Sequence, residues 1–185
     1  MFAKPSTLYH STNDGKTFTE INAKINNATI RKDNGLQKHP FAAQKVYLVA
    51  HTQEAHSDLY ITEDGGKSFT HVTMPFLLDG ALMFYPEKDS KYQDWILAHE
   101  SQTLSLYLSV DGGKHWNKLL DHVISYKWSS YESDPTGTIY AIYNNGMQMT
   151  MMGMISSPAD NELRKSNDLG SSWSTIREEV YTFGM

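Results

Sequence analysis

The chain contains no cysteine, so no disulfide can form within it and thiol chemistry is excluded. Arginine occurs only at Arg31, Arg164 and Arg177, and the formal net charge is −5. Because binding to phosphate backbones needs concentrated Lys and Arg, nucleic acid is not expected as a partner. No run of about 18 apolar residues occurs, and residues 1–6 lack the apolar core of a signal peptide. We therefore expect neither a membrane span nor a signal peptide within this sequence.

The residues that are present indicate packed β-structure. Hydrophobic residues make up 39% and aromatic residues 12% of the 185 residues, which is enough for one domain with a core. No amphipathic helix is evident, and Pro, Gly and Asn separate short runs rich in β-branched and aromatic residues. Several of these runs are almost continuously apolar, which is typical of strands buried on both faces. The expected strands include residues 28–31, 45–50, 80–85, 94–99, 122–128 and 138–143.

One short polar motif occurs four times: Ser/Thr, any residue, Asp/Asn, any residue, Gly, any residue, Thr/Ser/His, aromatic. The copies occupy residues 11–18, 62–69, 109–116 and 166–173, so their starts are 51, 47 and 57 residues apart. A period of this size predicts a repeat architecture. The defining residues are Ser11, Asn13, Gly15 and Phe18; Thr62, Asp64, Gly66 and Phe69; Ser109, Asp111, Gly113 and Trp116; and Ser166, Asp168, Gly170 and Trp173.

The residue types of the motif fit a tight turn between two strands. Glycine adopts positive φ at little cost, and Asp or Asn accepts hydrogen bonds from the backbone of its own turn. The Ser or Thr hydroxyl adds a further local bond, and the aromatic side chain can cover the turn. We therefore predict a structural role for each copy and expect no metal site and no cofactor. Calcium or carbohydrate binding by these acidic residues is the less favoured interpretation.

The four motifs resemble Asp-boxes, also called BNR repeats, of sialidase-like and sortilin-like β-propellers. The resemblance implies an all-β fold, a β-propeller segment of four-stranded antiparallel blades in which each box joins the third and fourth strands. The phase of the repeat would make residues 1–185 one partial propeller without a second domain, an open arc of about three and a half blades. The remaining blades of the same propeller are then expected partners. A four-bladed closure of this chain is the alternative.

The segments between the motifs resemble the sortilin family, the vacuolar protein sorting receptors whose VPS10 domain contains a ten-bladed propeller. These segments are residues 25–31, 74–86, 94–98, 120–128 and 172–184, and the likeness covers nearly the whole chain, as a fragment of the early blades. The resemblance implies a luminal module, without catalysis, that binds peptides or proteins for sorting and vesicular transport between Golgi and endosome. It would belong to a type I membrane glycoprotein of the Golgi, endosome and cell surface.

The sequence departs from the family in two places. Some family members carry Cys near the positions of Ile124 and residues 146–149, and that bridge is missing here. The loop over residues 144–154 has no counterpart in the family pattern. Since known ligand contacts of the family lie largely in later blades, no ligand-binding residue is assigned.

A segment of a secreted Asp-box glycosidase or of a glycan-binding propeller is the alternative function. A sialidase needs several Arg residues to hold the substrate carboxylate, and three scattered Arg are too few. Other glycoside hydrolases need two suitably separated carboxylates, for which Asp94 and Glu100 are the candidates. A photosynthetic assembly factor of the same propeller kind has no positive support.

Three further features are candidate sites. Asn27, with Ala28 and Thr29, forms a sequon for N-glycosylation in a luminal protein. Five methionines between Met147 and Met154 suggest an adaptable contact loop, with Cu(I) binding by thioethers as a less favoured alternative. Histidines titrate near endosomal pH and could contribute to acid-triggered ligand release. They are His10, His39, His51, His56, His71, His99, His115 and His122.

Overall fold

The computed structural model describes residues 7–50, 52, 55–87, 91–150, 153–155, 157 and 160–180. The features expected at residues 1–6, His51, Met151, Met152 and residues 181–185 lie outside the described residues. The chain divides into two compact units, Met1–Leu82 and Met83–Met185, which are described separately below. In the part of the chain that the structure describes, no helix has the length and apolar character needed to cross a lipid bilayer.

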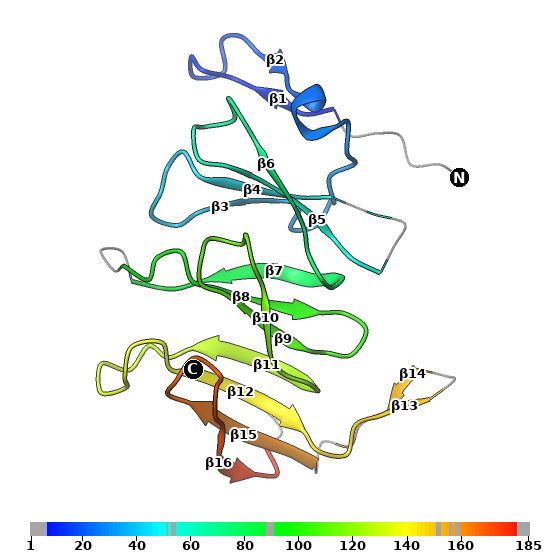
Figure 1. Ribbon diagram of the computed structural model, residues 1–185, viewed down its shortest axis with the longest axis vertical. Coiled ribbons are helices and arrows are strands. Elements are labelled where there is room, and N and C mark those ends of the chain that lie inside the picture. The colour runs from blue at the N-terminus through cyan, green and yellow to red at the C-terminus, as the bar shows by residue number, and fades with distance from the viewer. Residues whose placement is uncertain are drawn as a thin grey trace. The chain divides into compact units, whose positions relative to one another are not determined.

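Unit 1 contains a two-stranded hairpin and one four-stranded antiparallel sheet (Figure 1). The hairpin pairs β1 (Tyr9–His10) with β2 (Thr19–Glu20), and a single 3-10 turn, η1 (Asn22–Ile25), follows it. The sheet has the order β3-β4-β5-β6. Its strands are β3 (Leu36–Lys38), β4 (Val46–Ala50), β5 (Asp58–Thr62) and β6 (Thr70–Thr73).

A second four-stranded sheet has the order β10-β9-β8-β7, and the boundary between the units falls within β7. Its strands are β7 (Leu78–Phe84), β8 (Ile96–Glu100), β9 (Leu106–Ser109) and β10 (Asn117–Leu120). Neighbouring strands follow one another along the chain, which is the up-and-down order of a propeller blade.

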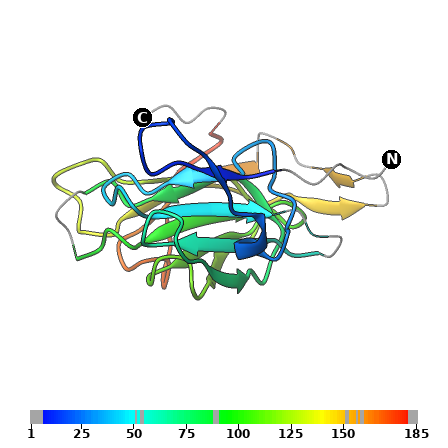
Figure 2. The same ribbon diagram turned by 90° about the horizontal axis from the view of Figure 1, so that it is seen from above.

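The third four-stranded sheet has the order β11-β12-β15-β16. Its strands are β11 (Val123–Trp128), β12 (Ile139–Asn144), β15 (Asn161–Ser166) and β16 (Ser174–Glu178). The connection from β12 to β15 forms its own hairpin, β13 (Gln148–Thr150) and β14 (Gly153–Ile155), at the methionine-rich loop. Figures 1 and 2 show this hairpin extending away from the sheet that carries it.

The second strand of each sheet is the most deeply buried, as its apolar sequence predicts. All five residues of β8 are buried, and Tyr47, Leu48, Val49 and Ala50 of β4 are at most 2% exposed. In unit 1 the core contains Ile25, Ile30, Leu48, Ala50 and Tyr60. In unit 2 it contains Tyr85, Leu97, Leu106, Leu108, Val123, Trp128, Ile139 and Ala141. The prediction of an all-β fold with four-stranded antiparallel sheets is confirmed.

The prediction of a strand at residues 28–31 is wrong. Residues 28–31 form no strand, and only Ile30 makes an isolated bridge, to Ala50. The first strand of this sheet begins five residues later, at Leu36, after a tight turn at Gly35. A Cβ at Gly35 would lie 1.9 Å from the carbonyl oxygen of Arg31. The chain therefore folds back on itself there, and no regular strand can run through residues 28–36.

Candidate functional site

The second, third and fourth motifs each form the turn between the third and fourth strands of a four-stranded sheet. The first motif joins β1 to β2 in the two-stranded sheet. Thr62, Ser109 and Ser166 end their strands and are at most 2% exposed. In all four turns the Ser or Thr hydroxyl oxygen accepts the N–H of the motif glycine at 2.7–2.8 Å. The buried end of each third strand is thus hydrogen-bonded to its own turn.

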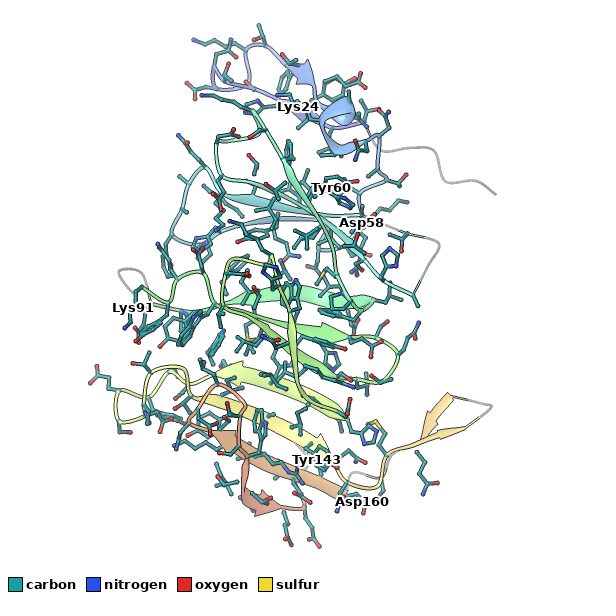
Figure 3. The ribbon with its side chains drawn as sticks, in the orientation of Figure 1. Lys24, Asp58, Tyr60, Lys91, Tyr143 and Asp160 are labelled. Carbon is teal, nitrogen blue, oxygen red and sulfur yellow. The ribbon has the colours of Figure 1, made fainter. Side chains whose placement is uncertain are left out.

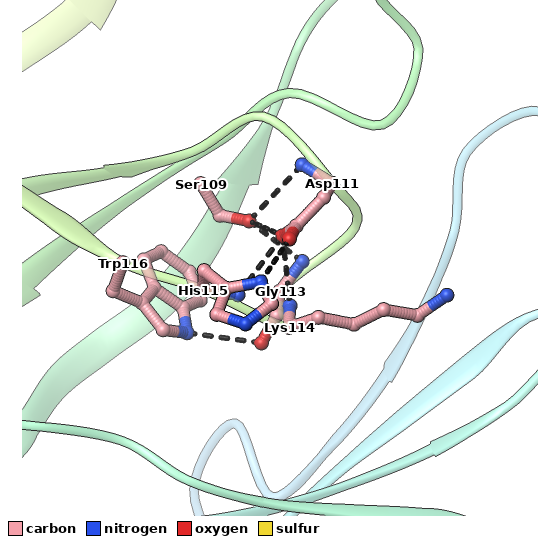
Figure 4. A network of polar contacts seen from close by, with 6 residues as sticks. All are labelled: Ser109, Asp111, Gly113, Lys114, His115 and Trp116. Carbon is pink, nitrogen blue, oxygen red and sulfur yellow. Dashed lines mark hydrogen bonds and ion pairs between the residues drawn. The ribbon is translucent and has the colours of Figure 1, made fainter.

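The acidic residue of the motif organises the rest of the turn, as Figure 4 shows for the third copy. Asp111 Oδ1 accepts the hydroxyl of Ser109 at 2.9 Å and the N–H groups of Lys114 and His115 at 3.1 and 2.9 Å. Asp111 Oδ2 lies 2.5 Å from Nδ1 of His115. Every contact spans at most four residues, so the carboxylate is a local acceptor for the turn.

The other copies repeat this arrangement with different side chains at the seventh position. In the second and fourth copies a serine hydroxyl, from Ser68 or Ser172, donates to the carboxylate at 2.6 Å. In the first copy, Asn13 accepts the N–H of Thr17 through Oδ1 and donates to its hydroxyl through Nδ2, both at 2.9 Å. An amide can therefore replace the carboxylate when the seventh residue offers an acceptor.

These hydrogen bonds stabilise the ionised carboxylates. The serine hydroxyl and the backbone N–H of Ser172 lower the pKa of Asp168 to about 2. The same bonds from Ser68 hold the pKa of Asp64 far below its usual range. Burial by itself would raise the pKa of Asp111, but the bonds from His115 and Ser109 outweigh it and the pKa is lowered. The carboxylates are occupied within their turns, and this leaves little capacity for an external ligand.

The closing aromatic residues pack beside their turns to different extents. Trp116 Nε1 donates to the carbonyl oxygen of Gly113 at 3.0 Å. Phe69 packs against the core of unit 1 and Trp173 against the core of unit 2. Phe18 of the first motif is 63% exposed, and β1–β2 is only a two-stranded sheet. The cover over the turn is therefore least complete in the first copy.

The residue before each motif glycine also has positive φ, a feature that the motif pattern does not specify. It is Asp14, Gly65, Gly112 or Leu169, with φ between 56° and 74°. The N–H groups of Gly65 and Gly112 donate to the carbonyl oxygens of Gln44 and Asp94, each at 2.9 Å. Both acceptors lie two residues before the second strand of the same sheet, so the turn also positions that strand.

Lys24 connects the second motif to η1. Its ammonium group donates to the carbonyl oxygens of Gly66 and Lys67 at 3.1 and 2.8 Å. Figure 3 labels this lysine on the segment that follows the first hairpin. No sequence pattern indicated this contact, because Lys24 is more than 40 residues from both acceptors along the chain.

Comparison with known proteins identifies the family. The family model described as "Sortilin, neurotensin receptor 3" matches residues 6–185, almost the whole chain.

The chain belongs to the sortilin family.

Individual sortilin-family proteins are similar over the same region. Sortilin of Danio rerio is 33% identical over 181 residues, which is 97% of this chain and 20% of that protein. The VPS10 domain-containing receptor SorCS1 of Homo sapiens is 32% identical over 126 residues, 67% of this chain and 10% of its own length. The chain thus spans about a fifth of the length of the sortilins it matches.

Solved structures agree on the fold. The GH74 xyloglucanase from Xanthomonas campestris superposes with a TM-score of 0.53 over 88% of this chain and 26% of that enzyme, at 17% identity. An ancestral GH74 enzyme superposes with a TM-score of 0.51 at 14% identity over 92% of this chain and 23% of its own. At this identity the likeness shows the propeller fold alone.

Among the described residues, each unit has a hollow on its surface. The hollow in unit 1 has a volume of about 370 Å³ and is mainly apolar, with Tyr9, Ile21, Leu36, Val46 and Phe69 among its lining residues. The hollow in unit 2 has a volume of about 250 Å³ and is acidic. Its lining consists of Asn145, Asp160, Asn161, Glu162, Glu178 and Glu179.

The two carboxylates considered for glycoside hydrolysis do not form a pair. Asp94 precedes β8, and Glu100 is its last residue. A strand advances about 3.3 Å per residue, so six residues separate them by roughly 20 Å, about twice the largest spacing in inverting glycosidases. Glu100 is 6% exposed and accepts the N–H groups of Gln102 and Thr103, both at 2.7 Å. The geometry gives this pair no hydrolytic role.

The histidines are scattered over the described residues. His71 of β6 and His56, which precedes β5, both lie near Asp58 at the start of β5. His71 Nε2 lies 2.9 Å from Asp58 Oδ1, and His56 Nε2 lies 4.0 Å from the same oxygen. The ring of His71 stacks on Tyr60 with centroids 4.7 Å apart. In the described part of the chain no group of three His, Asp or Glu residues is arranged to hold a metal ion.

The remaining histidines have local roles where the structure describes them. His39 accepts two backbone N–H groups through Nδ1, and His99 Nε2 contacts the carbonyl oxygen of Val123 at 2.7 Å. His122 stacks on Tyr143, and His10 lines the hollow in unit 1.

Asn27 is exposed and adopts the left-handed conformation, with φ 55°. Its neighbour Asn26 caps η1 in the same conformation. The sequon therefore lies on a surface turn directly after the 3-10 segment.

Proposed function

We propose that this chain is part of the luminal ligand-binding propeller of a sortilin-like sorting receptor, which binds peptides or proteins for transport between Golgi and endosome. The family match over residues 6–185 is the observation that carries this proposal. The receptor would be a type I membrane protein, with the remaining blades of the propeller outside this sequence. Its site of action would be the lumen of the Golgi and endosome and the cell surface.

The geometry of the turns supports a binding module in which the repeats are structural. The polar groups of all four motifs bond within their own turns, as the third copy shows for Asp111 and Ser109. Ligand recognition is then left to loops and strand faces elsewhere on the propeller. The same reasoning supports the proposal that the module is not an enzyme, because the motif carboxylates accept hydrogen bonds from their own turns.

The proposal is tested with the whole luminal part of the protein, secreted from a eukaryotic host and immobilised. Peptides and proteins of the host secretome are passed over it, and bound species are identified by mass spectrometry. We expect a defined set of bound peptides or proteins that is absent from an unrelated propeller. Absence of such a set, together with hydrolysis of xyloglucan or sialosides, would favour the glycosidase interpretation instead.

We also propose that Asn27 carries an N-linked glycan in the secretory pathway. Its exposure and its position on a turn support access by the glycosylating enzyme. In protein from a secretory host, peptide mapping should find the glycan on Asn27. Asn27→Gln and Thr29→Ala should both remove it, whereas Asn26→Gln should keep it. An unmodified Asn27 in the wild-type protein would contradict the proposal.

A further inference from the structure

The sequence contains two Asn-Gly pairs, Asn34-Gly35 and Asn145-Gly146. In such a pair the backbone nitrogen of the glycine can attack the side-chain amide carbon of the asparagine, because glycine has no Cβ to obstruct ring closure. The five-membered succinimide that forms is hydrolysed to aspartate or isoaspartate. Asparagine is for this reason one of the thermolabile residues of proteins.

The two pairs differ in the freedom of the glycine. Gly35 is buried, and a Cβ there would lie 1.9 Å from the backbone oxygen of Arg31 and 2.8 Å from the side chain of Ile30. Movement of the Gly35 nitrogen towards the side chain of Asn34 would disturb this tight backbone turn. The first pair is therefore held in a geometry that opposes ring closure.

Asn145 and Gly146 are both exposed, in the turn that leaves β12. The closest atoms to a Cβ built on Gly146 belong to the side chain of Asp160, with Oδ2 at 2.2 Å. These are atoms of a side chain that can rotate. The preceding Asn144, by contrast, is fully buried, and its Nδ2 donates to the carbonyl oxygen of Ser157 and to Oδ1 of Asn161.

Asn145 also lines the acidic hollow of unit 2. Four carboxylates line this hollow, from Asp160, Glu162, Glu178 and Glu179. Glu162 has a cationic partner in Arg164, whose Nη2 lies 2.9 Å from Oε2. In Figure 3, Asp160 lies at the same end of the sheet as Tyr143, next to the start of this turn. A negative charge at position 145 would therefore arise among existing negative charges.

We propose that Asn145 is a site of spontaneous deamidation, and that its conversion adds a fifth carboxylate to the acidic hollow of unit 2. The Gly146 nitrogen loses its proton and forms a bond to Cγ of Asn145, and the Nδ2 group leaves as ammonia. Water then adds to either carbonyl carbon of the succinimide and opens the ring. The net change is one water consumed and one ammonia released, with no oxidant or further reactant.

The new carboxylate should loosen the end of the sheet where β12, β15 and β16 meet. Like charges that line the same hollow disfavour one another's ionised state, so the folded structure is destabilised while the carboxylates are ionised. The isoaspartate product also lengthens the backbone by one methylene at the base of the β13–β14 hairpin. Deamidation thus changes the charge at position 145 and, in the isoaspartate product, the length of the backbone that leads into the β13–β14 hairpin.

The test is peptide mapping of the purified protein after prolonged incubation in mildly alkaline buffer made with oxygen-18 water. We expect the labelled acid at Asn145 to accumulate several-fold faster than at Asn34, with none at Asn144. Fragment ions distinguish the two adjacent asparagines. Equal rates at Asn34 and Asn145, or conversion at Asn34 alone, would overturn the proposal.

Two matched variants test the consequence for charge. Asn145→Asp reproduces the aspartate product, and Asn145→Gln keeps a neutral amide that cannot form the same ring. At neutral pH and low salt, Asn145→Asp should unfold at lower urea concentration than Asn145→Gln, and the difference should shrink in acid and at high salt. A difference that is unchanged by pH and salt, or no difference, would contradict the role of the acidic hollow.

Discussion

Replacement of Asp111 by alanine should destabilise the third turn by a measurable amount. The substitution removes the acceptor for the Ser109 hydroxyl and for the N–H groups of Lys114 and His115, at 2.9, 3.1 and 2.9 Å. Each such bond contributes about 0.5–1.5 kcal/mol, so the three together contribute roughly 1.5–4.5 kcal/mol. The contact with the ring of His115, whose side chain is 88% exposed, adds little.

The expected loss lies at the lower end of this range. The side chain of Asp111 is 36% exposed, so water can replace part of the lost bonding. We expect Asp111→Ala to lower the free energy of unfolding by about 2 kcal/mol. The assay is urea denaturation followed by tryptophan fluorescence, with Asp33→Ala as an exposed carboxylate control.

Asp111→Asn provides the more stringent test. The first motif shows that an asparagine can accept the same backbone N–H, since Asn13 Oδ1 lies 2.9 Å from the N–H of Thr17. Asp111→Asn should therefore lose less than half as much stability as Asp111→Ala. Equal losses for the two variants, or an Asp111→Ala variant as stable as the wild type, would refute the bonding scheme of the turn.

Two further predictions concern a glycine and a salt bridge. Gly170→Ala should lower the free energy of unfolding by about 2–3 kcal/mol, because φ is 84° and the new Cβ would lie 2.7 Å from the side chain of Leu119. Gly65→Ala is the control: φ is 71° there, no atom lies within 4 Å of the new Cβ, and the loss should be about 1 kcal/mol. Equal losses in urea denaturation would exclude the contact with Leu119. The hydrogen bond from Lys165 lowers the pKa of Asp134, so this carboxylate stabilises the fold above its unfolded pKa of about 4, and the contribution is lost as the pH falls through the lower folded value. In Asp134→Asn, the free energy of unfolding should therefore fall less steeply as the pH is lowered below about 4 than it does in the wild type. An unchanged pH dependence would contradict the stabilising role of the Asp134–Lys165 pair.

The turns were predictable from sequence because their hydrogen bonds are local. In the third copy, Ser109 contacts Gly113 and Asp111 contacts His115, each four residues away. Such bonds depend on the order of residue types within one short window. The apolar second strands were predictable for a similar reason, since a continuous run of apolar residues marks burial on both faces.

The strand expected at residues 28–31 shows where local patterns fail. Its residues suit a strand, but the turn at Gly35 brings the chain back against Arg31 and the sheet begins at Leu36. Propensity there is overridden by the geometry of the following turn and by pairing with β4.

The sequence by itself determined the repeat, the chemistry of its four turns and the all-β character of the chain, because each depends on residues that are neighbours along the backbone. Only the tertiary structure decided which distant side chains meet. The register that pairs Asn144 with Asn161 and Glu162 with Glu178 gathers the acidic hollow beside Asn145. Strand register and the length of the connections determine these contacts, and neither can be read from a short stretch of the sequence.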